Sequence, residues 1–495
     1  MPVDSTPAGP LTRRRGGVLL HVTSLPSAYG RGDVGPAARA FVDFLADAGC
    51  TVWQVLPLVP THRVDRSPYN AMSALALNPE LISIDDLVTQ GLLAAEDAEA
   101  VTRGELSPAG ARDLVAARWP SLCAADPELA ADFEQWCAEH HGWLDDYVRF
   151  VALRESRDEP WTAWPVGLRD HDPAALEEAL APLAEQVEAL RALQYLVDRQ
   201  WAALREYAGA RGVLVFGDLP IFVSLDSADV WADRDMFRLD ASGRPIDVTG
   251  VPPDYFAADG QRWNNPHYDW ERMAADDFGW WRRRIGRQRE LFDIVRIDHF
   301  RGFEAAWHVP VDAPTAKEGH WEKSPGREVL TALVDTAGEG TLVAEDLGTI
   351  TPEVLELRDE FHLPGMKVLQ FAFDGDPDNW YLPAAHGTRS VVYTGTHDND
   401  TTYGWWLSLD DDTRTRVRSY AGDGPMPWAL VRLAYASTAV LAVVPAQDLL
   451  GLDGGARMNT PGVDTGNWGW QAADGSFTPD LATWLRTVVE ASDRL

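Results

Sequence analysis

Eight short apolar runs, each ending in turn or polar residues, are the feature that most restricts the folds open to this chain. They occupy residues 17–22, 52–58, 212–218, 292–298, 341–346, 366–371, 390–396 and 439–444. Continuous β-branched runs of this length are typical of strands buried on both faces of a parallel sheet. Helical patterns lie between many of them: after the first run, Pro36 suits a first helical turn, and Phe41, Phe44 and Leu45 share one face. The sequence therefore predicts an α/β fold, a (β/α)8 TIM barrel.

Two intervals between predicted strands are too long for a simple crossover. Residues 85–211 are rich in Ala, Glu and Leu and read as helical, with one apolar stripe at Leu183, Val187, Leu190, Val197, Trp201 and Leu204. Residues 225–290 contain turn signals, paired prolines and many aromatic residues. The predicted organisation is strands 1–2 in residues 1–84, a helical insertion leading into strand 3 in 85–211, strand 3 in 212–224, a loop-rich insertion with an active-site lid in 225–290, and strands 4–8 in 291–495.

Charge and cysteine content exclude several classes of partner. The chain has 495 residues, with 43 Lys and Arg against 76 Asp and Glu, which gives a net charge of −33. Such a chain repels the phosphates of nucleic acids and anionic membrane surfaces, and it lacks an apolar run of the ~20 residues that span a bilayer. Cys50, Cys123 and Cys137 match no zinc pattern and suggest a reduced, cytoplasmic setting. We expect a soluble monomer or weak homo-oligomer.

Four acidic residues, Asp218, Asp298, Glu345 and Asp398, each end or closely follow an apolar run. Catalytic residues of a barrel gather at the carboxyl ends of its strands. A single acid there is most simply a cap or an ion-pair partner, but four at one mouth indicate an active site. Two acids flanking a bond suit glycoside chemistry, in which trapping of the sugar on one of them requires carboxyls about 5–5.5 Å apart.

Basic and aromatic residues accompany the acids. Arg296, His299 and His397 could bind sugar hydroxyls and keep a carboxylate ionised, or simply satisfy the acids. Among 21 tryptophans, those expected near the mouth, where an indole can cover a sugar ring, are Trp263, Trp405, Trp406, Trp468 and Trp470. For any one of them a place in the core is the alternative. The stretch 398–400 lacks the Gly and the distant Glu of a calcium loop, so no metal is expected.

Three motifs carry a resemblance to a known family. Arg296-Ile-Asp-His-Phe-Arg-Gly-Phe303, Ala344-Glu-Asp-Leu-Gly348 and Thr396-His-Asp-Asn-Asp400 together resemble the 4-α-glucanotransferases, or amylomaltases, of glycoside hydrolase family 77. Further matching stretches are 23–26, 53–57, 67–69, 217–220, 253–256, 261–263, 447–451, 457–462 and 467–468. Each motif alone is weak, but their number and order, from about residue 16 to about residue 470, make the match specific.

The resemblance implies a barrel enzyme that works by a retaining double displacement. Asp298 matches the family nucleophile, Glu345 the general acid/base, and Asp398 the third carboxylate, which binds ring hydroxyls. The matching substrate-binding positions are Arg296, His299, His397 and Asp218 around the sugar, Tyr69 with Ser67 on the donor side, and Asp254, Gln261, Trp263 and Asn467 on the acceptor side or its lid. The implied substrates are maltodextrins, starch or glycogen fragments, with glucose as an acceptor, and the family needs no metal or organic cofactor.

The sequence departs from the family pattern near the expected lid, residues 250–267. Trp263-Asn264-Asn265-Pro266 stands where the family has Trp-Gly-Asn-Pro, and Asn tolerates a left-handed conformation better than most residues. Residues 62–66 replace a glycine-containing run, and Leu77 stands where the family often has Gly.

Two alternative functions stay open: a related α-glucan hydrolase, and a non-catalytic glucan-binding protein. Retention of all three acids argues against the second, because binding alone needs neither a nucleophile nor an acid.

Overall fold

A computed structural model describes residues 9–62, 65–253, 258–463 and 465–495. Its larger sheet has eight parallel strands in the order β10-β11-β12-β1-β2-β3-β6-β9. The strands are β1 (Arg15–Leu19), β2 (Val52–Gln54), β3 (Leu214–Pro220), β6 (Ile294–Asp298), β9 (Leu342–Ala344), β10 (Gly365–Val368), β11 (Ser390–Tyr393) and β12 (Leu441–Pro445). The backbone N–H of Ala344 donates to the carbonyl of Pro364 at 2.9 Å, which links the two ends of this order. Each predicted run supplies one strand, so the prediction of a (β/α)8 barrel is confirmed.

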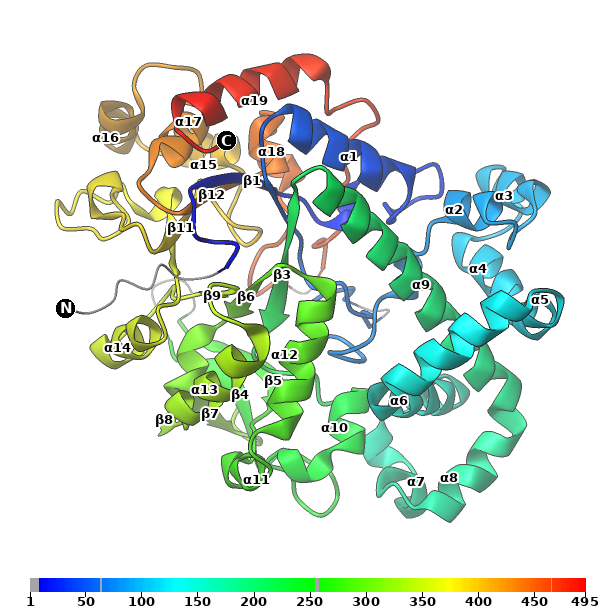
Figure 1. The fold of residues 1–495 in the computed structure, drawn as a ribbon. Helices are drawn as coiled ribbons and strands as arrows, with labels where there is room; N and C mark the ends of the chain where they lie inside the picture. Colours follow the sequence, from blue (N-terminus) through cyan, green and yellow to red (C-terminus); the bar gives the residue numbers. More distant parts are fainter. Residues whose placement is uncertain (1–8, 63–64, 254–257, 464) are drawn as a thin grey trace, which may run out of the picture.

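Helices surround the barrel (Figure 1). They include α1 (Pro36–Asp47), α12 (Gly279–Leu291), α13 (Gly326–Ala337), α14 (Pro352–Glu360), α17 (Trp428–Ala436) and α19 (Pro479–Ala491). Helix α1 shows why the sequence folds this way. Pro36 occupies its first turn, where the missing N–H costs nothing, and Phe41 and Phe44 are buried on one face. The Phe41 ring meets Trp53 of β2 edge-on, with ring centroids 5.2 Å apart, which fixes the helix against the sheet.

The interval between β2 and β3 is helical. It contains α2 (Ile84–Thr89), α3 (Ala95–Thr102), α4 (Pro108–Ala117), α5 (Trp119–Ala125), α6 (Pro127–Ser156), α7 (Val166–Arg169), α8 (Pro173–Leu180) and α9 (Ala184–Ala210). The long helices α6 and α9 lie side by side, and the Trp136 indole donates to Asp198 at 2.9 Å between them (Figure 1). Among the described residues, no helix combines the length and apolarity that a membrane crossing would need.

A second sheet, which the sequence analysis did not predict, is antiparallel and has the order β5-β4-β7-β8. Its strands are β4 (Asp247–Val251), β5 (Gln261–Pro266), β7 (Ala305–Pro310) and β8 (His320–Lys323). Strand β5 is polar along most of its length and only partly buried, so it shows none of the alternation of apolar and polar residues that marks a strand. The remaining α-helices of the described residues are α10 (Ala228–Ala232), α11 (Trp270–Ala275), α15 (Thr402–Ser408), α16 (Asp411–Ala421) and α18 (Ala446–Leu449).

The inside of the barrel is apolar at its base. One buried cluster collects inward-facing strand residues: Leu19, Val52, Phe216, Ile294, Val343, Met366, Val391 and Leu441. Side chains alternate along a strand, so the residues two positions after Phe216 and Ile294 also face inward. Those residues are Asp218 and Arg296, and both are buried. A charged layer therefore lies directly above an apolar floor, which is costly unless its members pair with one another.

Candidate active site

Strand register brings the predicted acids together. In the β3–β6 pair Asp218 lies opposite Arg296 and Pro220 opposite Asp298. In the β6–β9 pair Ile297 lies opposite Ala344, and the next residue, Glu345, donates its backbone N–H to the carbonyl of Ile297 at 3.0 Å. Asp298 and Glu345 thus lie at one level of the barrel mouth, and Asp218 lies one layer below them, level with Arg296.

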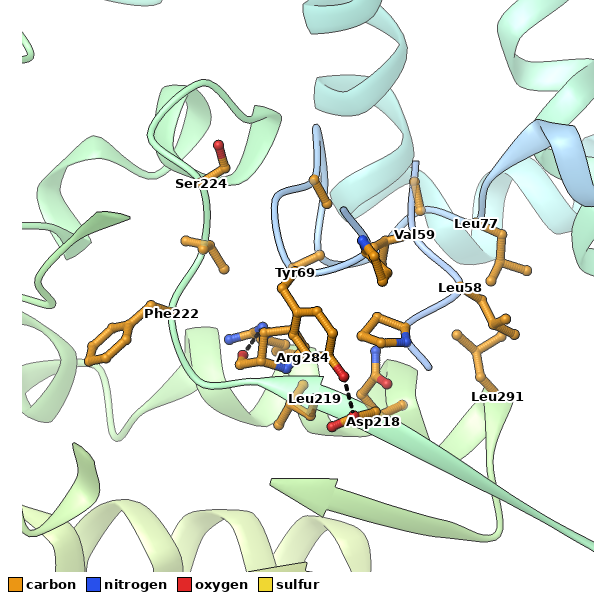
Figure 2. A pocket seen from close by; sticks show the side chains of 18 of the residues that line it. Leu58, Val59, Tyr69, Leu77, Asp218, Leu219, Phe222, Ser224, Arg284 and Leu291 are labelled. Carbon is orange, nitrogen blue, oxygen red and sulfur yellow. Dashed lines mark hydrogen bonds between the residues drawn. The ribbon is translucent and has the colours of Figure 1, made fainter. Parts of the chain in front are cut away.

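One guanidinium group connects two of these acids. Arg296 Nη1 donates to both oxygens of Asp218, at 2.8 and 2.7 Å, and its Nη2 lies 2.8 Å from Asp298 Oδ1. The Tyr69 hydroxyl donates to Asp218 Oδ2 at 2.7 Å (Figure 2). Asp218 and Arg296 are buried, while the side chain of Asp298 is 27% exposed. Burial raises the pKa of Asp298, and Arg296 opposes that rise.

Glu345 is held by two backbone amides. The N–H of His299 donates to its Oε2 at 2.7 Å, and the N–H of Leu347 donates to its Oε1 at 2.9 Å. His299 has a left-handed φ of 51°, uncommon for a residue with a side chain. Burial raises the pKa of Glu345 to about 6, although Arg296 and the two amides act in the opposite direction. The carboxyl therefore titrates near neutral pH, which suits an acid/base group.

Asp398 follows β11 and is the most open of the three predicted catalytic acids. Its side chain is 42% exposed. Its Oδ1 accepts a hydrogen bond from Asn459 Nδ2 at 2.6 Å, and its carbonyl accepts one from Arg457 Nη2 at 2.6 Å. The preceding His397 lies with Nε2 3.4 Å from the same Oδ1, and burial lowers the pKa of His397. The amide of Asn459 and the neighbouring imidazole of His397 thus position a carboxyl group that stays open to a ligand.

Three rings form a wall beside these acids. Tyr69 stacks on His397 with centroids 5.3 Å apart and planes 10° apart, and Trp468 tilts toward both, at 5.7 and 6.0 Å. The Ser67 hydroxyl accepts the N–H of Tyr69 at 3.2 Å and so shapes the turn that carries the ring. Aromatic faces beside exposed carboxylates are what a sugar ring, with apolar faces and polar edges, requires.

The hairpin of β4 and β5 reaches the site through Trp263. Its ring meets the His299 ring edge-on at 4.8 Å, and its Nε1 donates to Gln261 Oε1 at 3.2 Å. The next residue, Asn264, has a φ of 64°, so this position does need the left-handed conformation that Asn tolerates. The predicted site residue Asp254 lies outside the described residues.

Two groups of predicted residues have other partners. The Asn467 side chain bonds to its own loop, accepting from Thr460 N–H at 3.0 Å and donating to the Val463 carbonyl at 2.7 Å. Trp405 packs near Phe373, with centroids 6.1 Å apart, and the guanidinium groups of Arg414 and Arg418 lie over the Trp406 ring. The structure thus brings Trp263 and Trp468, rather than this tryptophan pair, against the predicted sugar-binding residues.

The sequence analysis did not single out Asn459 and Arg457 as site residues. Both belong to the matched stretch 457–462, so the signal was present in the sequence without a role attached to it. Their contact with Asp398 joins segments about 60 residues apart along the chain.

Small cavities flank the acids. One of about 30 Å³ lies behind Tyr69 and extends to Leu77, Asp218 and Arg284 (Figure 2). Another of about 20 Å³ is lined in part by His21 and His397. Asp218 lines the first of these cavities, and His397, which precedes Asp398, lines the second. Such a site can receive an extended ligand and place carboxyl groups on it.

The chain is similar to known proteins along nearly its whole length. A family model described as Glyco_hydro_77, 4-alpha-glucanotransferase, matches residues 20–476. A 4-alpha-glucanotransferase of Thermus thermophilus is 46% identical, covering 97% of this chain and 99% of the relative. The chloroplastic/amyloplastic 4-alpha-glucanotransferase DPE1 of Arabidopsis thaliana is 42% identical, covering 96% of this chain and 84% of the relative. Among solved structures, an amylomaltase from Streptococcus agalactiae in complex with acarbose has a TM-score of 0.92 at 32% identity, covering 97% of this chain and 100% of the other.

Proposed function

Since the chain belongs to the Glyco_hydro_77 family of 4-alpha-glucanotransferases, enzymes that act on α-1,4-glucans, we propose that it transfers glucan segments by a retaining double displacement. The donor is a maltodextrin or a fragment of starch or glycogen, and the acceptor is the 4-hydroxyl of glucose or of another maltodextrin. The acarbose bound to the related amylomaltase is consistent with this class of ligand.

The observation that carries the mechanism is the bridge from Asp218 through Arg296 to Asp298. It orients Asp298 Oδ1, and the positive charge of Arg296 opposes the rise that burial causes in the pKa of Asp298. In the first step an oxygen of Asp298 attacks the anomeric carbon, and the bond to the leaving 4-oxygen breaks. The proton of Glu345 moves to that oxygen, so the shorter glucan leaves as a neutral alcohol.

The second step reverses these roles. The Glu345 carboxylate takes the proton of the acceptor 4-hydroxyl, whose oxygen attacks the anomeric carbon and displaces Asp298 as a carboxylate. The new bond keeps the α-configuration because two inversions have occurred. Asp398, held by Asn459, binds ring hydroxyls and stabilises positive charge on the sugar in both transition states.

Transfer requires that the acceptor hydroxyl, rather than water, attacks the covalent intermediate. The β4–β5 hairpin brings Trp263 against His299, next to the nucleophile. We assign this hairpin and residues 250–267 the role of a lid that holds the acceptor and excludes water. Tyr69, Ser67, His397, Gln261, Asp254 and Asn467 are proposed substrate-binding residues. The cytoplasmic location and the monomeric or weakly oligomeric state remain predictions.

The test is incubation of the enzyme with pure maltotriose, with every product resolved by chain length. A ladder of longer maltodextrins together with glucose is the expected result. Glucose and maltose alone would favour the hydrolase, and unchanged maltotriose that still binds would favour the non-catalytic reading. Asp298→Ala should abolish the ladder while retaining sugar binding; a normal rate in this variant would rule out Asp298 as the nucleophile.

A further inference from the structure

A buried histidine and carboxylate cluster lies in the second sheet, apart from the proposed catalytic acids. Asp247 opens β4, His267 directly follows β5, and His308 lies on β7. Thr249 is the register partner of His308, so Asp247, two residues earlier on β4, faces the same side of the sheet as His308. One ligand atom from each of the three residues lies within 4.8 Å of the other two.

Two of the three side chains already lie at a distance that two ligands of one metal ion can have. His308 Nδ1 lies 2.9 Å from Asp247 Oδ2, a separation that two ligands of one ion can adopt. The His267 ring stacks on the His308 ring, with centroids 3.4 Å apart. His267 is only 2% exposed, and its Nε2 has no hydrogen-bond partner among the described residues. A buried ring nitrogen without a partner is costly, and it is also the atom that a metal ion takes.

Two charged groups, one from the segment before β4 and one from β8, face the cluster. Arg238 Nη2 lies 3.0 Å from Asp247 Oδ2, and its Nε lies 3.3 Å from Oδ1. Glu322 of β8 places Oε2 3.6 Å from His308 Nδ1. A carboxylate accepts about four hydrogen bonds, so Asp247 can keep Arg238 on Oδ1 while an ion takes Oδ2. Glu322 adds a second carboxyl group beside His308, and its Oε1 accepts a hydrogen bond from Arg238 Nη1 at 3.1 Å.

We propose that Asp247, His267 and His308 form a binding site for a divalent ion of the zinc class. Two imidazoles and a carboxylate suit zinc and its neighbours among the transition metals, rather than calcium or magnesium, which prefer oxygen ligands. Glu322 or a water molecule would complete a four-coordinate shell. Ion binding replaces the contact between His308 Nδ1 and Asp247, so any proton shared there is released to solvent.

The location gives the site a structural role. Asp247 lies at the start of the β4–β5 hairpin and His267 directly after its end, and His308 belongs to the neighbouring strand β7. A bound ion would therefore link both ends of the hairpin to β7. The Phe222 ring contacts both His267, at 5.7 Å, and His299, at 6.3 Å. The site therefore lies one aromatic ring away from the proposed active site and would stiffen the base of the lid.

Titration of the full-length protein with Zn²⁺, after treatment with a chelator and buffer exchange, tests this proposal. Calorimetry should give one equivalent of bound Zn²⁺, and Co²⁺ at the same site should give the visible bands of a four-coordinate ion. His267→Gln and His308→Gln should each weaken Zn²⁺ binding by about tenfold or more. His141→Gln is the control, because His141 is exposed on α6, outside the second sheet, and its Nδ1 lies 2.8 Å from the Ala138 carbonyl of its own helix.

Two outcomes would overturn the proposal. One is Zn²⁺ binding in His267→Gln as tight as in the unmodified protein, with circular dichroism showing that the variant is folded. The other is a result on the unmodified protein: adding Zn²⁺ does not raise its melting temperature, and adding Co²⁺ does not give the visible spectrum of a four-coordinate ion. Because neither readout depends on turnover, failure here is distinguishable from failure of the proposed glucan transfer.

Discussion

The backbone N–H of His299 donates a hydrogen bond of 2.7 Å to Oε2 of Glu345, so the residue that follows Asp298 holds the proposed acid/base. His299 itself has a left-handed φ of 51°, at the point where the chain leaves β6. The ring of the same residue meets Trp263 of the lid hairpin. His299 thus follows the proposed nucleophile in the chain, holds the proposed acid/base and contacts the lid hairpin.

The raised pKa of Glu345, about 6, predicts a loss of activity on the alkaline side. Glu345 must carry its proton to release the leaving glucan, so kcat/KM for maltotriose should fall as pH rises through about 6. With an α-glucosyl fluoride donor, whose leaving group needs no proton, kcat/KM should fall much less as the pH rises. Identical profiles for the two donors would contradict the assignment of Glu345 as the acid.

Arg296→Lys should lower kcat by about a hundredfold or more, because one ammonium cannot hold Asp218 and Asp298 in the fork geometry of the guanidinium. Steady-state kinetics with maltotriose would measure the change, and thermal melting would check that the barrel remains folded. Arg283→Lys, in a half-exposed ion pair with Asp233, is the matched control and should leave kcat unchanged. A loss of less than tenfold in Arg296→Lys would show that the bridge does not orient Asp298.

Asn459→Ala should reduce kcat by about tenfold to a hundredfold. The substitution removes the 2.6 Å hydrogen bond to Asp398 Oδ1, and a bond to a charged group contributes about 1.5–3 kcal/mol. Asn379→Ala removes an amide that bonds to the Phe371 carbonyl and the Tyr381 N–H of an exposed segment, and it should have little effect on kcat. Equal kinetics in the two variants would show that Asp398 is positioned without Asn459.

Substitutions of Asn264 should change the balance between transfer and hydrolysis. Its φ of 64° suits Gly, so Asn264→Gly should keep the maltodextrin ladder. Asn264→Val places a β-branched residue in the left-handed region at a cost of about 1–3 kcal/mol and should distort the hairpin near Trp263. Product analysis with maltotriose should then show more glucose and maltose relative to longer products. An unchanged ratio in Asn264→Val would argue that this hairpin does not exclude water.

Much of the fold could be predicted because burial on both faces leaves a continuous apolar run. Strands β3, β6 and β9, which end at Pro220, Asp298 and Ala344, were identified in this way. The second sheet gave no such signal: β5 is polar and partly exposed, and its pairing with β4 is decided by contacts that no local pattern records.

The sequence by itself determined the barrel and the identities of the acids at its mouth. Each acid follows an apolar run, and parallel strands end at one edge whatever the insertions between them. Only the tertiary structure decided which partners those acids have. The Arg296 bridge, the Asn459 contact and the cluster of Asp247, His267 and His308 join residues tens of positions apart. Chain spacing carries no information on such contacts, because the packing of whole elements sets the distances between them.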